Sequence, residues 1–211
     1  MPVTESNQKQ QTIYQRQQYA KGGLGRRHWD KRDQTALNLV RPSDLTIVDI
    51  GCGEGITLEK MHRLFPERKV FGIDFLSENI DICRHHGCKV EQGDVYNLQL
   101  SSKSVDFVLF MEVIEHLEDP ETAIQEIYRV LAPGGRLVIV FPNDRFFKIA
   151  RILTLRFREA AYDPGHVRQW TPYDMRSFLS EQGFTVAFSQ NMPFYFWPVS
   201  LHCIMAADKN S

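Results

Sequence analysis

A loop with glycine at every second position contains the residues of this chain best suited to chemistry. Gly51, Gly53 and Gly55 follow an apolar run that includes Asp49, and a helical pattern begins directly after them. Glycine has no Cβ, so backbone N–H groups in such a loop can approach a ligand closely. The order strand, glycine loop and helix therefore predicts a site for a nucleotide-like ligand in an α/β protein.

Acidic side chains lie at or just past the ends of four successive predicted strands: Asp49, Asp74, Asp94 and Glu112. Open parallel sheets bind their ligands at the carboxyl ends of the strands. Asp74 comes about 20 residues after the glycines, where an acid can accept hydrogen bonds from both hydroxyls of a ribose. Asp94 follows Gly93, and that pair also suits an ordinary turn. The pattern predicts that these acids meet at one edge of the sheet.

A run of two glutamates and a histidine follows the fourth predicted strand. Glu112, Glu115 and His116 would share one face if a helix began at Glu112. Two carboxylates and an imidazole could hold a divalent ion that acidifies an acceptor hydroxyl, and His166 could add a ligand. In the favoured alternative no metal binds, and Glu112, His116 and His166 are the candidate catalytic residues. His116 would then be a base or acceptor-site residue, or would orient the loop, and His166 is more readily explained as solvated or hydrogen-bonded to backbone.

The elements that must position these residues alternate between strand and helix. The predicted strands and helices are 46–50, 55–65, 70–74, 77–86, 90–92, 105–111, 120–131 and 136–141, in chain order. This alternation predicts an α/β fold with a parallel sheet and helices on both faces. Helices are also expected at 12–20 and 28–41, separated by a flexible segment at 22–25. A helix at 172–182 and strands near 184–190 and 200–207 complete the pattern.

The motifs resemble those of the class I S-adenosylmethionine-dependent methyltransferases. The similarity is carried by Asp49–Gly55, Gly72–Asp74, Gly93–Val95, Glu112–Leu117 and Leu131–Gly135. It implies a Rossmann-like, doubly wound sheet of seven mostly parallel strands, with one antiparallel strand near the C-terminus. A dehydrogenase is not favoured, because the fingerprint G-x-G-x-x-G would need its third glycine where this chain has Ile56.

The resemblance also implies a division of the chain and a cofactor site. One methyltransferase domain, 1–211, would comprise an N-terminal helical cap (1–41), a cofactor-binding core (42–142), an inserted acceptor-side lid (143–170) and a C-terminal helix with strands (171–211). Asp74 would accept from the ribose and Asp94 from the adenine amine, with Val95 nearby. The residues expected around S-adenosylmethionine, and its product S-adenosylhomocysteine, are Asp49, Gly51, Cys52, Gly53, Gly55, Asp74, Phe75, Gly93, Asp94, Val95, Met111 and Glu112.

The implied function is methyl transfer to a small acceptor, of which a hydrophobic or aromatic one is the narrower expectation. One alternative is a metal-assisted O-methyltransferase of a quinone-like phenol or an RNA 2′-hydroxyl. The other is a non-catalytic protein that binds S-adenosylmethionine. In-line displacement from a sulfonium needs mainly alignment and desolvation of the nucleophile. Only a poor nucleophile, such as a phenol, needs its proton removed.

Composition limits the range of partners. The 211 residues are 43% hydrophobic, enough for one sizeable core, and the formal net charge is −1. DNA is not an expected partner and RNA is not favoured, because the near-neutral charge gives no general attraction for nucleic acid. The four cysteines form no C-x-x-C pair, and the N-terminal segment lacks the pattern of a signal peptide. The expected location is therefore the cytoplasm.

Three segments could shape the acceptor side. Residues 145–158 combine an apolar stripe with basic side chains, which predicts a lid helix or, alternatively, a helix in peripheral contact with a membrane. The aromatic run 194–197 could line an apolar acceptor pocket, although sheet and core positions are the favoured expectation. Near the N-terminus, five large residues could cover the cofactor or make surface contacts: Tyr14, Tyr19, Arg26, Arg27 and Trp29.

Overall fold

The structure of the chain, a computed structural model, describes residues 15–143 and 167–210. Its centre is a seven-stranded sheet with the order β3-β2-β1-β4-β5-β7-β6. The strands are β1 (Thr46–Ile50), β2 (Lys69–Asp74), β3 (Val90–Gln92), β4 (Val105–Met111), β5 (Leu131–Pro142), β6 (Phe184–Met192) and β7 (His202–Lys209).

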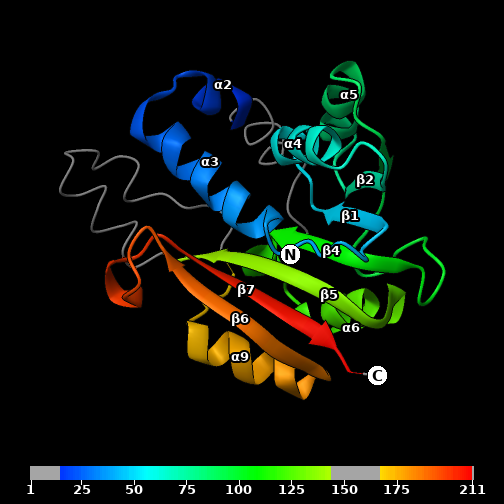
Figure 1. Cartoon of the computed structure of the whole chain (residues 1–211), viewed down its shortest axis with the longest axis vertical. Helices are drawn as coiled ribbons and strands as arrows, with labels where there is room; N and C mark the ends of the chain where they lie inside the picture. Colours follow the sequence, from blue (N-terminus) through cyan, green and yellow to red (C-terminus); the bar gives the residue numbers. More distant parts are fainter. Residues whose placement is uncertain (1–14, 144–166, 211) are drawn as a thin grey trace.

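The first five strands pair in parallel, and β7 pairs antiparallel with both β5 and β6. This confirms the predicted class I methyltransferase fold, including the antiparallel strand near the C-terminus. Strand order reverses between β1 and β4, which both end at the same edge of the sheet (Figure 1). Ligands of open α/β sheets bind at such a point.

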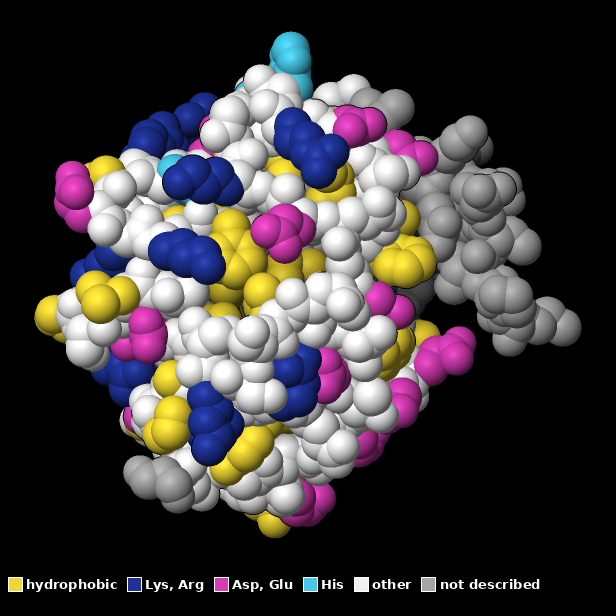
Figure 2. Space-filling view, turned by 90° about the vertical axis from the view of Figure 1, so that its right-hand side faces the viewer, with side chains coloured by type: hydrophobic (Ala, Val, Ile, Leu, Met, Phe, Trp, Pro, Cys, Tyr) yellow, Lys and Arg dark blue, Asp and Glu magenta, His cyan; other side chains and the backbone are white. Residues whose placement is uncertain are grey.

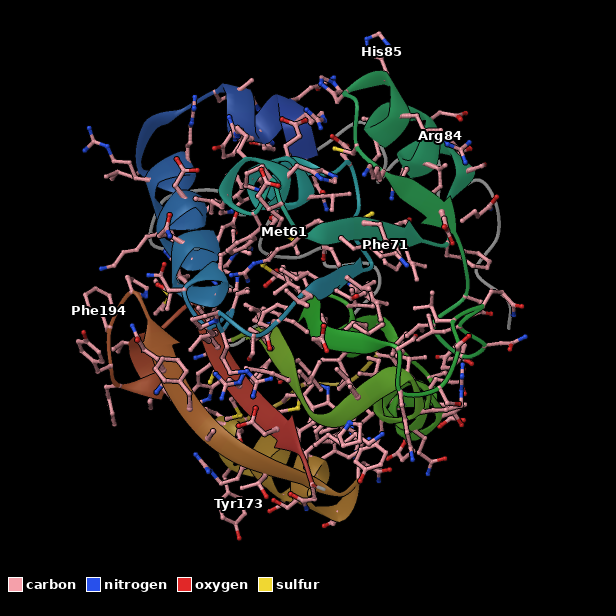
Figure 3. All side chains as sticks on the ribbon, turned by 45° about the vertical axis from the view of Figure 1, so that its right-hand side comes forward. Met61, Phe71, Arg84, His85, Tyr173 and Phe194 are labelled. Carbon is pink, nitrogen blue, oxygen red and sulfur yellow. The ribbon has the colours of Figure 1, made fainter. Side chains whose placement is uncertain are left out.

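Helices cover both faces of the sheet (Figure 1). They are α2 (Gln15–Ala20), α3 (Gly23–Leu37), α4 (Ile56–Leu64), α5 (Ser77–His85), α6 (Pro120–Val130) and α9 (Pro172–Glu181), with short 3₁₀ turns η1 (Ile114–His116) and η2 (Trp197–Val199). One apolar core lies under α3, α4 and α5 and includes Met61, whose side chain points toward the sheet in Figure 3. The other core lies under α6 and α9. Such burial on both faces is the main stabilising contribution to this kind of fold.

Two helix starts follow the expected capping chemistry. Asp119 accepts a hydrogen bond from the N–H of Thr122 (3.1 Å) at the start of α6, and Thr171 accepts from the N–H of Asp174 (3.2 Å) at the start of α9. Each cap satisfies a backbone donor that has no partner inside the helix. The positions of these two helices were therefore predictable from local sequence.

The N-terminal helical region differs from the prediction. The segment 22–25 is not a flexible linker, because α3 begins at Gly23 and runs to Leu37 rather than from 28 to 41. Gly22 precedes the helix with a φ of 71°, which glycine adopts without strain. After Leu37 the chain continues in tighter turns, in which the N–H groups of Leu39 and Val40 donate to the carbonyls of Ala36 and Leu37 (3.2 Å each), and Pro42 prevents a return to helix at Arg41.

Several expectations fall outside the part that the structure describes. They concern most of the lid 143–170, the helix at 145–158, Tyr14 and His166. Over the described ranges, no helix is both long and apolar enough to cross a membrane. Basic and acidic side chains share the molecular face shown in Figure 2, as the near-neutral net charge suggests.

Candidate functional site

The glycine loop between β1 and α4 adopts a geometry that side chains would prevent. Gly51 and Gly55 have φ values of 74° and 80°, in the left-handed region. A Cβ on Gly55 would lie 2.7 Å from the Cys83 sulfur, and one on Gly51 would collide with the side chain of Val113. Both positions therefore require glycine. The loop lies at the carboxyl end of β1, with the side chain of Gln15 against Gly53.

Asp74 holds this loop in place. Its Oδ2 accepts a hydrogen bond from the Gly53 N–H (2.7 Å), while Oδ1 accepts from the Leu76 N–H (3.0 Å) and the Asn79 side chain (2.9 Å). The residue is buried. The acid at the end of β2 thus links the glycine loop to the start of α5. Each carboxylate oxygen has two lone pairs, so Oδ2 retains capacity for a further donor such as a ribose hydroxyl.

The β3 end lies beside this acid and is open to solvent. Asp94 is exposed, and its Oδ1 accepts from the N–H of Tyr96 (2.9 Å), so Gly93 and Asp94 do form a turn. Phe75 is 60% exposed, and its carbonyl accepts from the Gln92 side chain (2.9 Å). The structure therefore brings Asp74, Phe75 and Asp94 to one edge, as the sequence predicts for ligand-binding residues.

Asp49, near the end of β1, is a buried carboxyl group. Burial raises its pKa to about 8, and the negative charges of Asp33 and Asp74 add to this effect, while Arg32 opposes it. The group is thus largely protonated near neutral pH. A cationic ligand at the glycine loop would favour its carboxylate form.

The N-terminal helix α2 is attached to the glycine loop through Glu54. The buried carboxylate of Glu54 accepts from the N–H groups of Arg16 (2.7 Å) and Gln15 (3.3 Å), the first residues of α2. In return, the Arg16 guanidinium donates to the Glu54 carbonyl (2.9 Å from Nε) and to the Glu59 carboxylate (2.5 Å). The predicted cap therefore does lie beside the loop. The sequence analysis did not single out Glu54.

Helix α3 brings two charged residues into the interior, Arg32 and Asp33, which sequence reasoning missed. Asp33 Oδ1 accepts from Arg32 Nε (3.1 Å) and Nη2 (3.0 Å). Asp33 Oδ2 accepts from Lys60 Nζ (2.7 Å) and the Thr57 hydroxyl (3.1 Å), both on α4. Their burial could have been inferred from helical spacing, because Arg32 and Asp33 lie on the same face of the helix as the apolar Ala36.

Glu112 directly follows β4 and has a φ of 57°, rare for a residue with a Cβ. Its Oε1 lies 3.0 Å from Nε2 of His202 and 3.8 Å from Nη1 of Arg32. The other ring nitrogen of His202, Nδ1, lies 2.9 Å from Nε2 of His28, and the two rings stack with centroids 5.1 Å apart. The histidines come from β7 and α3, and neither was among the predicted site residues.

The predicted shared face of Glu112, Glu115 and His116 is wrong. The backbone of Glu112 lies in the left-handed region, so no α-helix begins there, and only the short 3₁₀ turn Ile114–His116 follows it. Glu115 is buried with its carbonyl accepting from the N–H of Val167 (2.8 Å), and His116 Nε2 lies 4.0 Å from Glu115 Oε1. Among the described residues, no group of three or more His, Cys, Asp or Glu side chains could hold a metal ion.

The aromatic run 194–197 is not strand, and only Trp197 packs against the core, beside Phe141, which corrects the favoured expectation for residues 194–196. Strand β6 ends at Met192, and Phe194, Tyr195 and Phe196 are 54%, 84% and 68% exposed. Figure 3 shows Phe194 projecting outward from the end of this hairpin. The Asn143 side chain donates to the Trp197 carbonyl (2.7 Å), which attaches the aromatic loop to the carboxyl end of β5.

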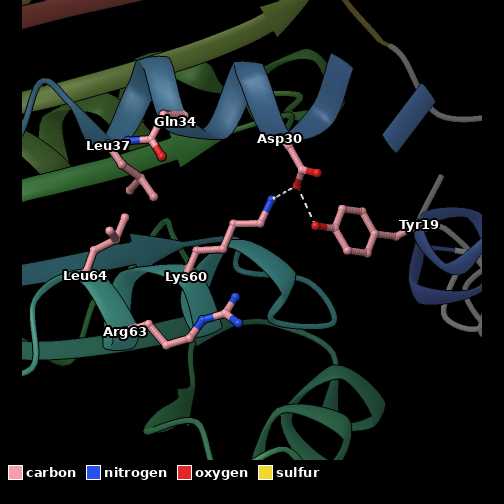
Figure 4. Close-up of a pocket in the computed structure, with 7 residues that line it drawn as sticks. All are labelled: Tyr19, Asp30, Gln34, Leu37, Lys60, Arg63 and Leu64. Atoms are coloured by element: carbon pink, nitrogen blue, oxygen red, sulfur yellow. Dashed lines mark hydrogen bonds and ion pairs between the residues drawn. The ribbon is translucent and has the colours of Figure 1, made fainter. Parts of the chain in front are cut away.

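A cavity of about 330 Å³ lies between α3 and α4 (Figure 4). Its lining residues are Tyr19, Asp30, Gln34, Leu37, Lys60, Arg63 and Leu64. Asp30 accepts from Lys60 Nζ (2.7 Å) and from the Tyr19 hydroxyl (2.5 Å). Tyr19 also stacks on Trp29 and lies under the Arg26 guanidinium. These three residues therefore contact one another at the junction of α2, α3 and α4, whereas Arg27 is exposed.

Comparison with known proteins agrees with the geometry. A family model described as "Methyltransferase domain" matches residues 48–139. The mitochondrial ubiquinone biosynthesis O-methyltransferase of Rattus norvegicus is 32% identical over 164 residues, which are 68% of this chain and 45% of that protein. The chain belongs to the class I S-adenosylmethionine-dependent methyltransferases. The family implies S-adenosylmethionine as methyl donor.

Two further similarities extend over most of this methyltransferase chain. A protein of Mycolicibacterium smegmatis named "Probable S-adenosylmethionine-dependent methyltransferase" is 28% identical, covering 75% of this chain and 60% of that protein. A chain in a solved complex with the Haloferax volcanii Trm112 methyltransferase activator shares the fold, with a TM-score of 0.68, 19% identity, and coverage of 90% and 93% of the two chains. The chain spans about half the length of the curated relatives it matches.

The described site residues form two groups at one edge of the sheet. The first surrounds the glycine loop and contains Asp49, Asp74 and Asp94 at the ends of β1, β2 and the β3 turn. The second surrounds Glu112 and His202, at the end of β4 and the start of β7. Arg32 interacts electrostatically with Asp49 of the first group and Glu112 of the second, so the two groups are close.

Proposed function

We propose that this chain transfers a methyl group from S-adenosylmethionine to a small acceptor at the carboxyl edge of β1 and β4. The observation that supports this most is the glycine loop, whose bare backbone is held by Asp74 next to the buried carboxyl group of Asp49. The adenosyl part would lie toward Asp74, Phe75 and Asp94. The sulfonium would lie near Asp49, and Gly51, Cys52, Gly53, Gly55, Gly93, Val95 and Met111 would complete its surroundings.

The acceptor would enter on the side of Glu112 and His202. The exposed aromatic loop at 194–197 is attached to the end of β5 on this side and favours a hydrophobic or aromatic acceptor. The similarity to a ubiquinone biosynthesis O-methyltransferase favours a hydroxyl group as the methylated atom. His116 and His166 remain candidates for contact with that acceptor.

Calorimetry with purified protein tests the donor site. We expect S-adenosylmethionine and S-adenosylhomocysteine to bind, and Asp74→Ala to weaken binding of both by at least about tenfold through the loss of charge-assisted hydrogen bonds and of loop support. Asp81→Ala removes an exposed carboxylate from α5 and serves as the matched control. Absence of any heat with wild-type protein, or equal affinities in the two variants, would contradict the proposal.

Turnover of methyl-labelled donor with phenols, amines and thiols then tests transfer. Labelled product with at least one acceptor class is the expected result. Binding without turnover on every class would favour the non-catalytic alternative. A rate that depends on adding Mg²⁺ or Zn²⁺ to chelator-treated protein would favour the metal-assisted alternative, and a steep salt dependence of RNA binding would favour an RNA acceptor.

A further inference from the structure

Three side chains from three separate elements form a line of two close polar contacts on the acceptor side, a His28–His202 hydrogen bond and a His202–Glu112 ion-pair contact. Glu112 follows β4, His202 begins β7 and His28 lies in α3. The Glu112 carboxylate is 3.0 Å from His202 Nε2, and His202 Nδ1 is 2.9 Å from His28 Nε2. Both spacings are hydrogen-bond distances. The family motifs in the sequence contain neither histidine, so this line is a property of this chain's own packing.

The chemistry of the groups assigns the protons along this line. An ionised carboxylate repels a ring nitrogen lone pair and attracts an N–H, so at the 3.0 Å spacing we assign the proton of His202 to Nε2, facing Glu112. In a neutral imidazole the other nitrogen then accepts, so Nδ1 of His202 accepts from Nε2–H of His28. His28 in turn keeps an unprotonated Nδ1. No other hydrogen-bond partner of His28 lies among the described residues.

Three observations make His28 Nδ1 suitable as a proton acceptor. The residue is partly exposed, so a small molecule can reach its ring. Burial lowers its pKa to about 4, with His202 and Arg32 adding to the effect and Glu112 and Asp33 opposing it, so the Nδ1 lone pair is unprotonated at physiological pH, although the same shift makes the ring a weaker base than free imidazole. The positive charge gained by proton uptake would be stabilised through His202 by Glu112.

We propose that His28 is the general base that removes the proton from a hydroxyl acceptor, and that His202 and Glu112 are positioning residues that fix its tautomer. This rests on the proposed function. The acceptor O–H proton moves to His28 Nδ1 while the oxygen forms a bond to the methyl carbon. The carbon–sulfur bond breaks, and its electron pair returns to sulfur as the thioether. Neutral amines already present a lone pair, so such a base points to an alcohol or phenol as substrate.

Substitution of His28 by glutamine removes the proposed basic nitrogen, Nδ1, but keeps a hydrogen-bond donor to His202. In His28→Gln the amide N–H can still donate to His202, as Nε2–H does, but no group replaces the basic Nδ1. We expect its methyl transfer to a phenol to fall by about 10²- to 10⁴-fold, the usual contribution of a general base. Affinity for S-adenosylhomocysteine should stay within about twofold of wild type. His85→Gln, at an exposed histidine of α5, is the matched control and should leave the rate unchanged, whereas His116→Gln tests the rival candidate in turn η1.

The outcomes distinguish this inference from the proposed function. If His28→Gln methylates phenols as fast as wild type, or if His116→Gln is the slower variant, His28 is not the base although the enzyme is still a methyltransferase. If wild type methylates only amines or thiols, the hydroxyl assignment is wrong. Failure of wild type to bind the donor, or to methylate any acceptor class, would instead contradict the proposed function.

A spectroscopic measurement tests the proton assignment without turnover. Long-range ¹H–¹⁵N correlation spectra of ligand-free protein should show both His28 and His202 protonated at Nε2 and unprotonated at Nδ1 near pH 7. Glu112→Gln should lower the pKa of His28 further, because the Glu112 charge raises it in the native protein. A His202 that carries protons on both nitrogens, with His28 protonated at Nδ1, would overturn the relay.

Discussion

Several acidic side chains lie close together near the carboxyl ends of the strands, and their negative charges repel one another. Asp33, Asp49 and Asp74 are each buried and interact electrostatically. Asp74 is compensated by three hydrogen-bond donors, and Asp33 by Arg32, Lys60 and Thr57. Asp49 lacks comparable donors, and burial together with the charges of Asp33 and Asp74 raises its pKa to about 8. In this arrangement one neutral acid is available to ionise when a cation arrives.

Stability should depend on pH through Asp49. Its pKa is about 8 in the folded chain and 3.8 in a model peptide, so the folded state binds the extra proton between these values. The contribution of Asp49 to the free energy of unfolding is therefore largest at the acid end of this window. It falls as pH rises, by at most about 1.4 kcal/mol per pH unit. Urea unfolding at pH 5, 6 and 7 should show this fall in the wild type. The slope should be smaller in Asp49→Asn.

The difference between the two proteins is the informative quantity, because histidines also titrate in this range. The same substitution at an exposed acid, Asp81→Asn, controls for removal of one surface charge. Identical slopes for wild type and Asp49→Asn would mean that Asp49 is ionised in the folded chain. The proposal that Asp49 is neutral until the cationic donor binds would then be wrong.

At the scale of elements, the glycine loop and α2 are joined through a single side chain. Glu54 accepts from the first two N–H groups of α2, which have no partner inside that helix. A six-residue helix is too short to be stable by itself, so this carboxylate and the Arg16 contacts must supply much of its order. Glu54 thus couples the glycine loop to the N-terminal cap.

Glu54→Ala should release α2 without unfolding the domain. Loss of hydrogen bonds to a charged acceptor corresponds to about 1.5–3 kcal/mol, or roughly 10- to 150-fold less protection of the amides of α2 from hydrogen exchange. Exchange measured by mass spectrometry over residues 15–20 gives the readout, with strand β4 as the internal reference. Glu78→Ala, an exposed glutamate in α5, should leave α2 unchanged. Equal protection in both variants would show that Glu54 does not hold the helix.

The sequence predicts some of these elements well and others poorly, for physical reasons. The glycine loop, the strands around it and the caps Asp119 and Thr171 depend on local backbone preferences, which neighbouring residues reveal. The conformation of Glu112 depends on contacts with β7 and α3, which are distant in sequence. The contact between His28 and His202 likewise joins residues that are 174 positions apart in the sequence, so no local pattern could indicate it.

At the scale of the whole molecule, α3 joins the two groups of site residues across the end of the sheet. Arg32 faces Glu112, and Asp33 connects Arg32 to Lys60 and Thr57 of α4. Lys60 continues this connection to Asp30 and the cavity in Figure 4. Buried charges are stable only while each keeps its partners. The position of His28 therefore depends on a network centred on Asp33, five residues further along the same helix.

Asp33→Asn should be the most disruptive single substitution of this network. The side chain is 1% exposed, and its loss of charge leaves Arg32 and Lys60 without their shared buried partner. Breaking a buried pair in this way costs about 3–5 kcal/mol, which equilibrium urea unfolding would measure. Asp30→Asn removes another carboxylate from the same lysine, but that side chain is 44% exposed and its loss should cost less than about 1 kcal/mol. Equal costs would indicate that Lys60 relies on both acids alike, and that α3 is held by its apolar contacts rather than by the buried charges.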